Sequence, residues 1–157
     1  MNDWLKVTIL SLLPVSELRG GLPYALYRGI PWYMAYPLCV LINAAVAPIA
    51  YVFLDTIHKL LYRWGFYARL FDKLVIRARH KLTEKVERFG FWGVAVFVGI
   101  PLPVTGAWTG TLGAWVLGLS RRKTMLAVLA GVTVSGLIVS FIYLAGIQAL
   151  DFFIKHV

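Results

Sequence analysis

The sequence predicts an all-α integral membrane protein made of two inverted repeats. Each repeat is a re-entrant helical hairpin followed by one transmembrane helix, and a basic amphipathic helix joins the two. Three observations support this prediction. The 157 residues are 60% hydrophobic, above the roughly 45–50% of soluble domains. Two long segments, 33–54 and 124–150, contain no charged residue. Between and before them lie short apolar pieces that are interrupted by proline and glycine.

Composition and length exclude several classes of protein. The net charge of +9 could indicate nucleic-acid binding, but the basic residues flank apolar segments as they do in membrane proteins, so no nucleic-acid partner is expected. Cys39 is the single cysteine, so no intrachain disulfide can form. His58, His80 and His156 lack the spacing of metal ligands, and no nucleotide-binding loop is present. We therefore expect a single membrane domain without metal, cofactor or catalytic residues.

The first hairpin is predicted over residues 4–31. Its first apolar stretch, 5–13, reaches only about 13 Å as a helix, less than half of a hydrocarbon core of roughly 30 Å. Glu17 and Arg19 follow directly, and four residues that favour a turn surround them: Pro14, Gly20, Gly21 and Pro23. Charge is costly at mid-membrane, so such a break is tolerated only in protein or beside a wet cavity. The alternative is one distorted spanning helix over residues 5–27.

The predicted transmembrane helix 33–54 is long enough to cross a bilayer and has aromatic residues toward its ends. Asn43 lies near its middle and either bonds to a neighbouring helix or faces a cavity beside Glu17. The next segment, 56–90, alternates basic and apolar residues at helical spacing. It predicts an amphipathic helical segment on the cytoplasmic membrane surface, packed on the transmembrane core or bound to anionic lipid head groups.

The second hairpin is predicted over residues 91–119. Its turn has the same character as the first and contains Pro101, Pro103, Gly106 and Gly110. The last transmembrane helix, 124–150, carries small residues four apart, which favour close helix packing: Ala127, Gly131 and Ser135.

The two halves share an order of elements. Pro14-Val15-Ser16 in the first turn matches Pro103-Val104-Thr105 in the second, and Gly29 and Gly118 end the two hairpins. If each hairpin returns to its own side, the halves have opposite orientations in the membrane. Most basic residues lie in 59–88 and 121–123, so the positive-inside rule places that face in the cytoplasm and both termini outside.

In this arrangement both turns meet at mid-membrane, where Glu17 can exchange a proton and Arg19 can pair with a carboxylate or phosphate. The helix after each turn begins there, and its free amides favour anions. Polar side chains that can join the site complete the prediction: Ser16, Asn43, Thr105, Trp108 and Thr109. The alternative is that Glu17 and Arg19 form only a structural pair that holds the hairpin.

Residues 16–23, Ser-Glu-Leu-Arg-Gly-Gly-Leu-Pro, and residues 100–110, Ile-Pro-Leu-Pro-Val-Thr-Gly-Ala-Trp-Thr-Gly, resemble the two signature segments of the small multidrug export family of prokaryotic membrane proteins. That family is similar to the DedA superfamily of re-entrant-loop membrane proteins. The resemblance implies a location in the cell membrane and an association with lipid-linked phosphates and proton-dependent transport. It does not establish a drug as substrate.

Three functions remain open at this point. The first is a carrier for an anionic, lipid-linked phosphate, driven by protons or the membrane potential. The second is a proton-coupled exporter of cationic amphiphilic drugs with Glu17 as the exchange site. The third is a non-transporting membrane scaffold. Two hairpins and two spans enclose little space, so a homodimer is also expected.

Overall fold

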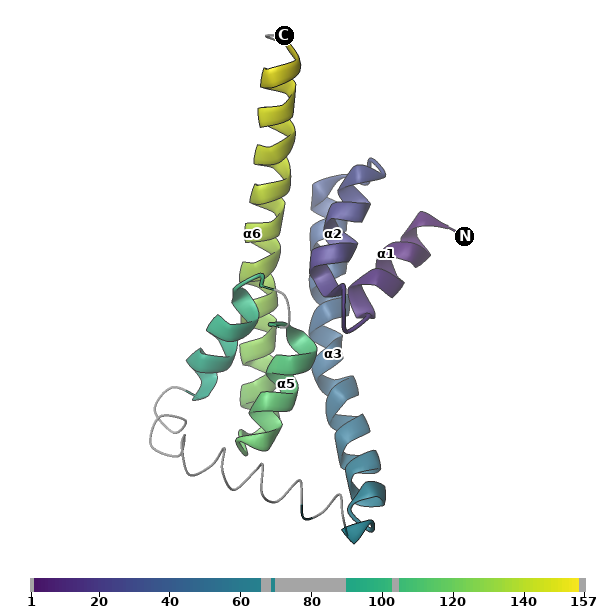
Figure 1. Ribbon diagram of the computed structural model, residues 1–157, viewed down its shortest axis with the longest axis vertical. Coiled ribbons are helices and arrows are strands. Elements are labelled where there is room, and N and C mark those ends of the chain that lie inside the picture. Colours follow the sequence, from purple (N-terminus) through teal and green to yellow (C-terminus); the bar gives the residue numbers. More distant parts are fainter. Residues whose placement is uncertain (1, 66–68, 70–89, 103–104, 156–157) are drawn as a thin grey trace.

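The computed structural model describes residues 2–65, 69, 90–102 and 105–155 (Figure 1). Its helices are α1 (Asp3–Leu12), α2 (Glu17–Tyr27), α3 (Trp32–Leu61), an unlabelled helix Gly90–Gly99, α5 (Ala107–Val116) and α6 (Arg121–Lys155). Every regular element in the described residues is a helix, which confirms the predicted all-helical class. The predicted amphipathic segment 56–90 lies largely outside the described residues.

Among the described residues, two helices are long and apolar enough to cross a membrane, Trp32–Leu54 within α3 and Arg121–Gly146 within α6. They correspond to the predicted spans 33–54 and 124–150. Polar groups join them along their length. The Tyr36 hydroxyl donates to the carbonyl of Thr133 at 3.0 Å, and the Tyr51 hydroxyl donates to Thr124 Oγ1 at 2.9 Å. Pairing these groups avoids the cost of leaving them unbonded in an apolar environment.

α1 and α2 form a helical hairpin rather than one continuous helix (Figure 1). The chain turns at 13–16, where Pro14 cannot continue the helical hydrogen bonding. The two helices approach closely because Gly21 has no side chain: a Cβ there would overlap the hydroxyl of Ser11. Asn43 Nδ2 donates to the carbonyl of Ser11 at 2.7 Å, which fixes this hairpin on α3.

The Gly90–Gly99 helix and α5 form the corresponding arrangement in the second half of the chain. Gly110 of α5 leaves room for Val98, since a Cβ at Gly110 would overlap that side chain. Gly131 of α6 lies against the same helix, where an added Cβ would be 2.7 Å from the carbonyl oxygen of Ala95. The small-residue spacing on α6 therefore serves close helix packing, as the sequence predicts.

The turn after α1 and the turn before α5 meet beside the middle of α3 and α6, approaching from opposite ends of the molecule (Figure 1). Buried aliphatic side chains from both halves surround this meeting point, among them Leu18, Leu22, Val98, Val128 and Val132. Contacts between residues far apart in the sequence thus place the two turns side by side. The Trp108 indole N–H, for example, donates to the carbonyl of Leu12 at 2.9 Å.

Candidate functional site between the two turns

Glu17 is the first residue of α2, and only 6% of it is exposed. Its backbone has φ of 48°, in the left-handed region that non-glycine residues rarely adopt. Such a conformation costs about 1–3 kcal/mol and persists only where surrounding contacts hold it. It lies at the predicted site, between the turn at 13–16 and the rest of α2.

The carboxylate of Glu17 crosses to the other hairpin and binds the beginning of α5. Its Oε1 accepts a hydrogen bond from the backbone N–H of Trp108 at 3.2 Å. Gly106 makes this contact possible, because a Cβ at that position would overlap the carboxylate. The first amides of a helix are unpaired and carry partial positive charge. Gly106, the N-cap residue of α5, has no side chain that could accept a hydrogen bond from these amides, so the carboxylate of Glu17 caps the helix instead.

Arg19 lies beside this contact but is held much more loosely. Its Nη2 is 3.8 Å from Glu17 Oε2 and 3.4 Å from Thr105 Oγ1. The first distance is too long for a hydrogen bond, and the second is near the limit. The side chain is 21% exposed. Because a guanidinium has five N–H donors, Arg19 can bind a further acceptor without breaking a strong contact within the described residues.

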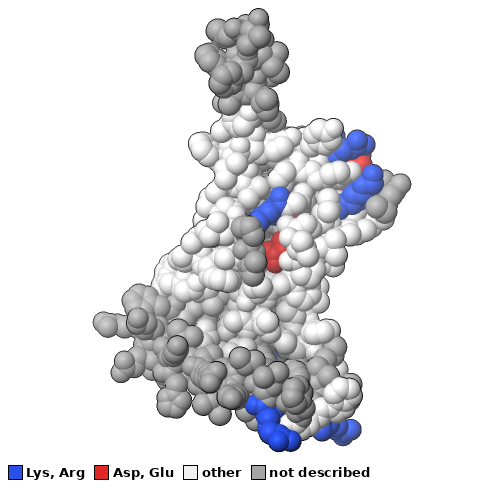
Figure 2. Space-filling model, in the orientation of Figure 1, with Lys and Arg blue, Asp and Glu red and all other residues white. Residues whose placement is uncertain are grey.

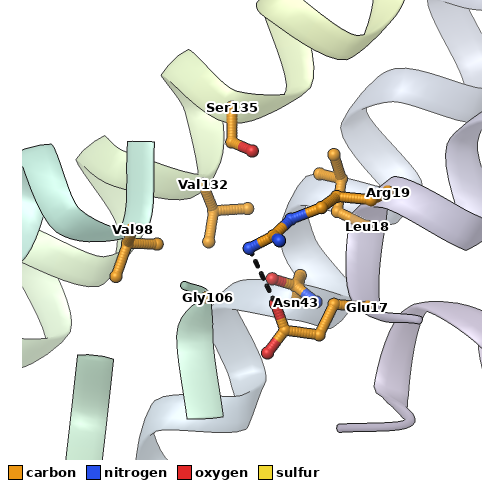
Figure 3. Close-up of a pocket in the computed structure, with 8 residues that line it drawn as sticks. All are labelled: Glu17, Leu18, Arg19, Asn43, Val98, Gly106, Val132 and Ser135. Carbon is orange, nitrogen blue, oxygen red and sulfur yellow. Dashed lines mark ion pairs between the residues drawn. The ribbon is translucent and has the colours of Figure 1, made fainter. Parts of the chain in front are cut away.

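Arg19 and Glu17 line a small cavity with room for about one water molecule. Figure 3 shows the Arg19 guanidinium in the middle of the group, with Ser135 of α6 on one side and Asn43 of α3 and Glu17 on the other. The remaining lining residues are mostly apolar: Leu18, Val98, Gly106 and Val132. Every described helix except α1 contributes to the cavity or its edge.

The other predicted polar residues lie near the cavity but make local contacts. Ser16 Oγ donates to the carbonyl of Leu10 at 2.5 Å. Thr105 Oγ1 donates to the carbonyl of Ile100 at 2.7 Å, while also facing Arg19. Thr109 Oγ1 accepts from the N–H of Gly106 at 3.0 Å. Trp108 contributes its backbone N–H to Glu17, while its indole bonds to Leu12.

Several residues expected at the turns lie inside helices instead. Gly20, Gly21 and Pro23 belong to α2, and Gly110 belongs to α5. The physical reason is that Pro14 alone ends α1, and the glycines serve close contacts: a Cβ at Gly20 would be 2.7 Å from Ser16 Cβ. Pro23 cannot donate to the carbonyl of Arg19, so it loosens α2 next to the site. Pro101 precedes the second turn, and Pro103 lies outside the described residues.

Four lining residues are absent from the site that the sequence predicts: Leu18, Ser135, Val98 and Val132. The sequence assigns Ser135 only to a packing face of its helix. Its signal is a hydroxyl at the middle of an uncharged span, the same signal that singles out Asn43. The valines carry no signal, because nothing distinguishes an apolar cavity wall from an ordinary core position.

The surface around the two turns is apolar. Val15 at the first turn is 98% exposed, and Leu13, Ile100 and Leu102 are also exposed. Figure 2 shows basic and acidic side chains near one end of this face and at one place near its middle, and basic side chains near the other end. The described charged residues near the ends include Asp3 and Arg28 at one and Arg63 and Arg121–Lys123 at the other. A partly exposed guanidinium surrounded by apolar side chains is thus the distinctive feature of the middle.

A comparison with protein families agrees with this arrangement. Residues 17–138 match the family described as "Putative small multi-drug export protein", and the match runs from the start of α2 through all of α3 and the second turn into α6. Neither the curated proteins nor the solved structures contain a match to this chain. The chain is therefore a membrane protein with two candidate transmembrane helices, and it belongs to the putative small multi-drug export protein family.

Proposed function

We propose that this protein is a carrier that moves an anionic amphiphile, of the lipid-linked phosphate type, through a site between two re-entrant turns at mid-membrane. The observation that carries the proposal is the state of Arg19. Its contacts at 3.4 and 3.8 Å are weak, and it faces the cavity from a partly exposed position. An arginine in this state is suited to bind a phosphate or carboxylate through two parallel hydrogen bonds.

The surroundings of Arg19 favour an amphiphile over a small hydrophilic anion. The exposed side chains of Leu13, Val15, Ile100 and Leu102 form an apolar surface beside the turns. A head group bound by Arg19 leaves an attached hydrocarbon chain against this surface or in the surrounding lipid. A hydrophilic anion gains nothing there and requires a wet path instead. The cavity is too small for any head group, so binding requires the turns to separate.

Inverted-repeat architecture is part of the proposal, and equivalent positions in the two halves support it. Gly29 and Gly118 both have positive φ, 76° and 75°, directly after α2 and α5. Each glycine lies within a matching helix cap. The Ile30 N–H donates to the Ala25 carbonyl, and the Leu119 N–H donates to the Ala114 carbonyl, both at 3.0 Å. At the same spacing along the sequence, Glu17 corresponds to Gly106 and Asn43 to Val132. All four residues line the cavity.

In the proposed repeat the two halves differ in chemistry. The first half supplies Glu17, Arg19 and Asn43, while the second supplies a helix end, a glycine, apolar side chains and one hydroxyl, that of Ser135. Broken helices that bring backbone amides and charged side chains to the membrane centre are typical of substrate sites in inverted-repeat carriers. Glu17 can couple transport to protons; alternatively, the charge of the substrate couples it to the membrane potential.

We further propose that the protein resides in the cell membrane of a prokaryote, with the end that carries Arg63 and Arg121–Lys123 in the cytoplasm and both termini outside. Reporter fusions at Val157 and within 76–82 test this orientation. A cytoplasmic C-terminus would contradict it. Anionic lipids as partners of segment 56–90 and a homodimeric state also remain proposals. In a dimer, a second copy encloses the apolar surface beside the turns and makes the pathway larger.

A second candidate function is proton-coupled export of cationic amphiphilic drugs. The description of the family as an export protein and the buried acid Glu17 favour it. Against it, the carboxylate of Glu17 is already bound to an amide of α5 and has an arginine beside it. A cation that enters this cavity must approach Arg19 and displace Glu17 from a favourable contact. The anionic substrate avoids both costs.

Ligand-induced shifts in melting temperature distinguish the two functions. Purified protein in detergent is heated with polyprenyl phosphate, with a cationic dye, or with the uncharged polyprenol as a control. We expect stabilisation by the phosphate alone, and loss of that stabilisation in Arg19→Lys because the planar fork is missing. Arg28→Lys, which alters a guanidinium far from the cavity, should behave like the parent. Stabilisation by the dye and not by the phosphate would support the second function.

A further inference from the structure

The contact between Glu17 and α5 is the only carboxylate contact between the two turns in the described part of the chain. It joins the first residue of α2 to the backbone of Trp108 at 3.2 Å. Other hydrogen bonds between described residues also cross between the turns. One runs from the Trp108 indole to the Leu12 carbonyl, and the other, longer one from Arg19 to Thr105 Oγ1. Neither of these hydrogen bonds involves a group that gains or loses a proton in the accessible pH range.

The contact between Glu17 and α5 depends on three features: the space at Gly106, the backbone conformation of Glu17 and its negative charge. The carboxylate fits only because Gly106 lacks a side chain. The backbone of Glu17 is held at a positive φ, which favours a different conformation once the contact is lost. The interaction with the end of α5 also depends on negative charge, because hydrogen bonds to ionised acceptors are roughly twice as strong as those to neutral ones.

We propose that Glu17, the Trp108 amide and the space at Gly106 form a proton-sensitive latch that holds the two turns together. While Glu17 is ionised, its carboxylate caps α5 and the cavity stays closed. When Glu17 takes up a proton, the cap weakens, Glu17 relaxes out of its left-handed conformation, and the turns separate. The indole contact of Trp108 does not depend on protonation and so limits how far they move.

The groups that face Glu17 do not titrate, so Glu17 is the proton sensor of this contact. From α2 comes Arg19, which stays charged at all relevant pH values. From α3 comes Asn43, from α6 Ser135, from the Gly90–Gly99 helix Val98, and from the second turn Thr105 and the amides of α5. None of these groups titrates, so within the described residues the pH response of this contact belongs to Glu17.

The inference deepens the proposed function, because separation of the turns is the step that admits a substrate. Its test uses no substrate, so failure of the latch and failure of transport are observed separately. Spin labels are attached at Val15→Cys and Leu102→Cys, both exposed positions on the two turns. The background is Cys39→Ala. Distances between the labels are measured in lipid nanodiscs at about pH 8 and about pH 5.

In the parent we expect one short-distance population at high pH and a longer-distance population that grows about tenfold at low pH. Glu17→Gln should show the longer distance at both pH values. Gly106→Ala should do the same, because its Cβ takes the place of the carboxylate. Gly113→Ala is the matched control on α5, where an added Cβ meets nothing within 4 Å, and it should follow the parent.

The proposal is overturned if folded Glu17→Gln keeps the short distance, or if it still responds to pH as the parent does. A short distance in Gly106→Ala contradicts it independently, since no space for the carboxylate remains in that variant. A parent that stays closed at low pH while Glu17→Gln is open contradicts the dependence on protons.

Discussion

Replacing Glu17 and Arg19 by glutamine, singly and together, decides whether the two residues act as one structural pair. At the observed 3.8 Å, their attraction is about 4 kcal/mol with an effective dielectric constant of 20, and about 1 kcal/mol in water. Taking each charge out of water costs several kcal/mol. The two terms nearly cancel, so the ion pair itself should contribute little to the stability of the fold.

The contact of Glu17 with α5 should contribute more. Hydrogen bonds to charged groups are worth about 1.5–3 kcal/mol, and this one also interacts with the end of a helix. Glu17→Gln keeps the shape but loses the charge, so it should lower stability by roughly 1–2 kcal/mol. Arg19→Gln leaves that contact intact and should cost less than about 1 kcal/mol. The double variant should resemble Glu17→Gln, because no rescue is expected when the pair is not the source of stability.

The assay is thermal unfolding of the four proteins in one detergent at neutral pH. For a chain of this length, 1 kcal/mol corresponds to roughly 2–4 °C. We therefore expect melting temperatures in the order parent, Arg19→Gln, then Glu17→Gln together with the double variant. A buried structural pair predicts something else: each single change costs about 3–5 kcal/mol and the double change restores stability. That result would refute the inference that the helix-capping contact, and not the ion pair, stabilises the fold.

Three further predictions concern contacts around the site and at the end of the molecule. Gly131→Ala should destabilise the protein by about 1–3 kcal/mol, because its Cβ would lie 2.7 Å from the Ala95 carbonyl, whereas Gly93→Ala, at an open position, should melt like the parent. Trp108→Phe removes the indole hydrogen bond and should cost about 0.5–1.5 kcal/mol in the same assay; an unchanged melting temperature would contradict that role. The hydrogen bond from Arg28, at 3.0 Å, lowers the pKa of Asp3, so the stabilising effect of this pair is present above the unfolded pKa near 3.9 and lost as pH falls through the folded value. Asp3→Asn should flatten melting temperature against pH in that acidic range, and an unchanged profile would count against the pair.

The sequence predicts most of the helical architecture because the length of an uncharged, apolar run can be read from the local sequence alone. Uncharged runs long enough to cross a bilayer are visible directly, and they correspond to the long apolar helices α3 and α6. The turn after Leu12 is predicted because Pro14 breaks a short apolar stretch next to two charged residues. Which of the neighbouring glycines and prolines form the turn is not readable, since Gly20, Gly21 and Pro23 also suit a helix that packs closely against another.

The site is predicted less completely, because its contacts are not local. Glu17 and Arg19 stand out as charges in an apolar segment, and the structure brings both to one cavity. Their arrangement depends on Trp108 and Gly106, which lie far along the chain. A glycine that makes room for a carboxylate has the same appearance in the sequence as a glycine in a turn. The hydroxyls of Ser16 and Thr109 satisfy nearby backbone groups instead of facing the cavity.

Transport by the purified protein is the most direct test of the central claim that Arg19 binds an anionic amphiphile between the turns. Proteoliposomes are prepared with the parent, Arg19→Lys and the control Arg28→Lys, and movement of a labelled polyprenyl phosphate between leaflets is followed with and without a pH gradient or membrane potential. The account predicts movement that a gradient accelerates, at least about tenfold slower in Arg19→Lys and unchanged in Arg28→Lys. The account would be contradicted if the three proteins gave equal rates, or if liposomes without protein moved the lipid as fast as those that contain the parent.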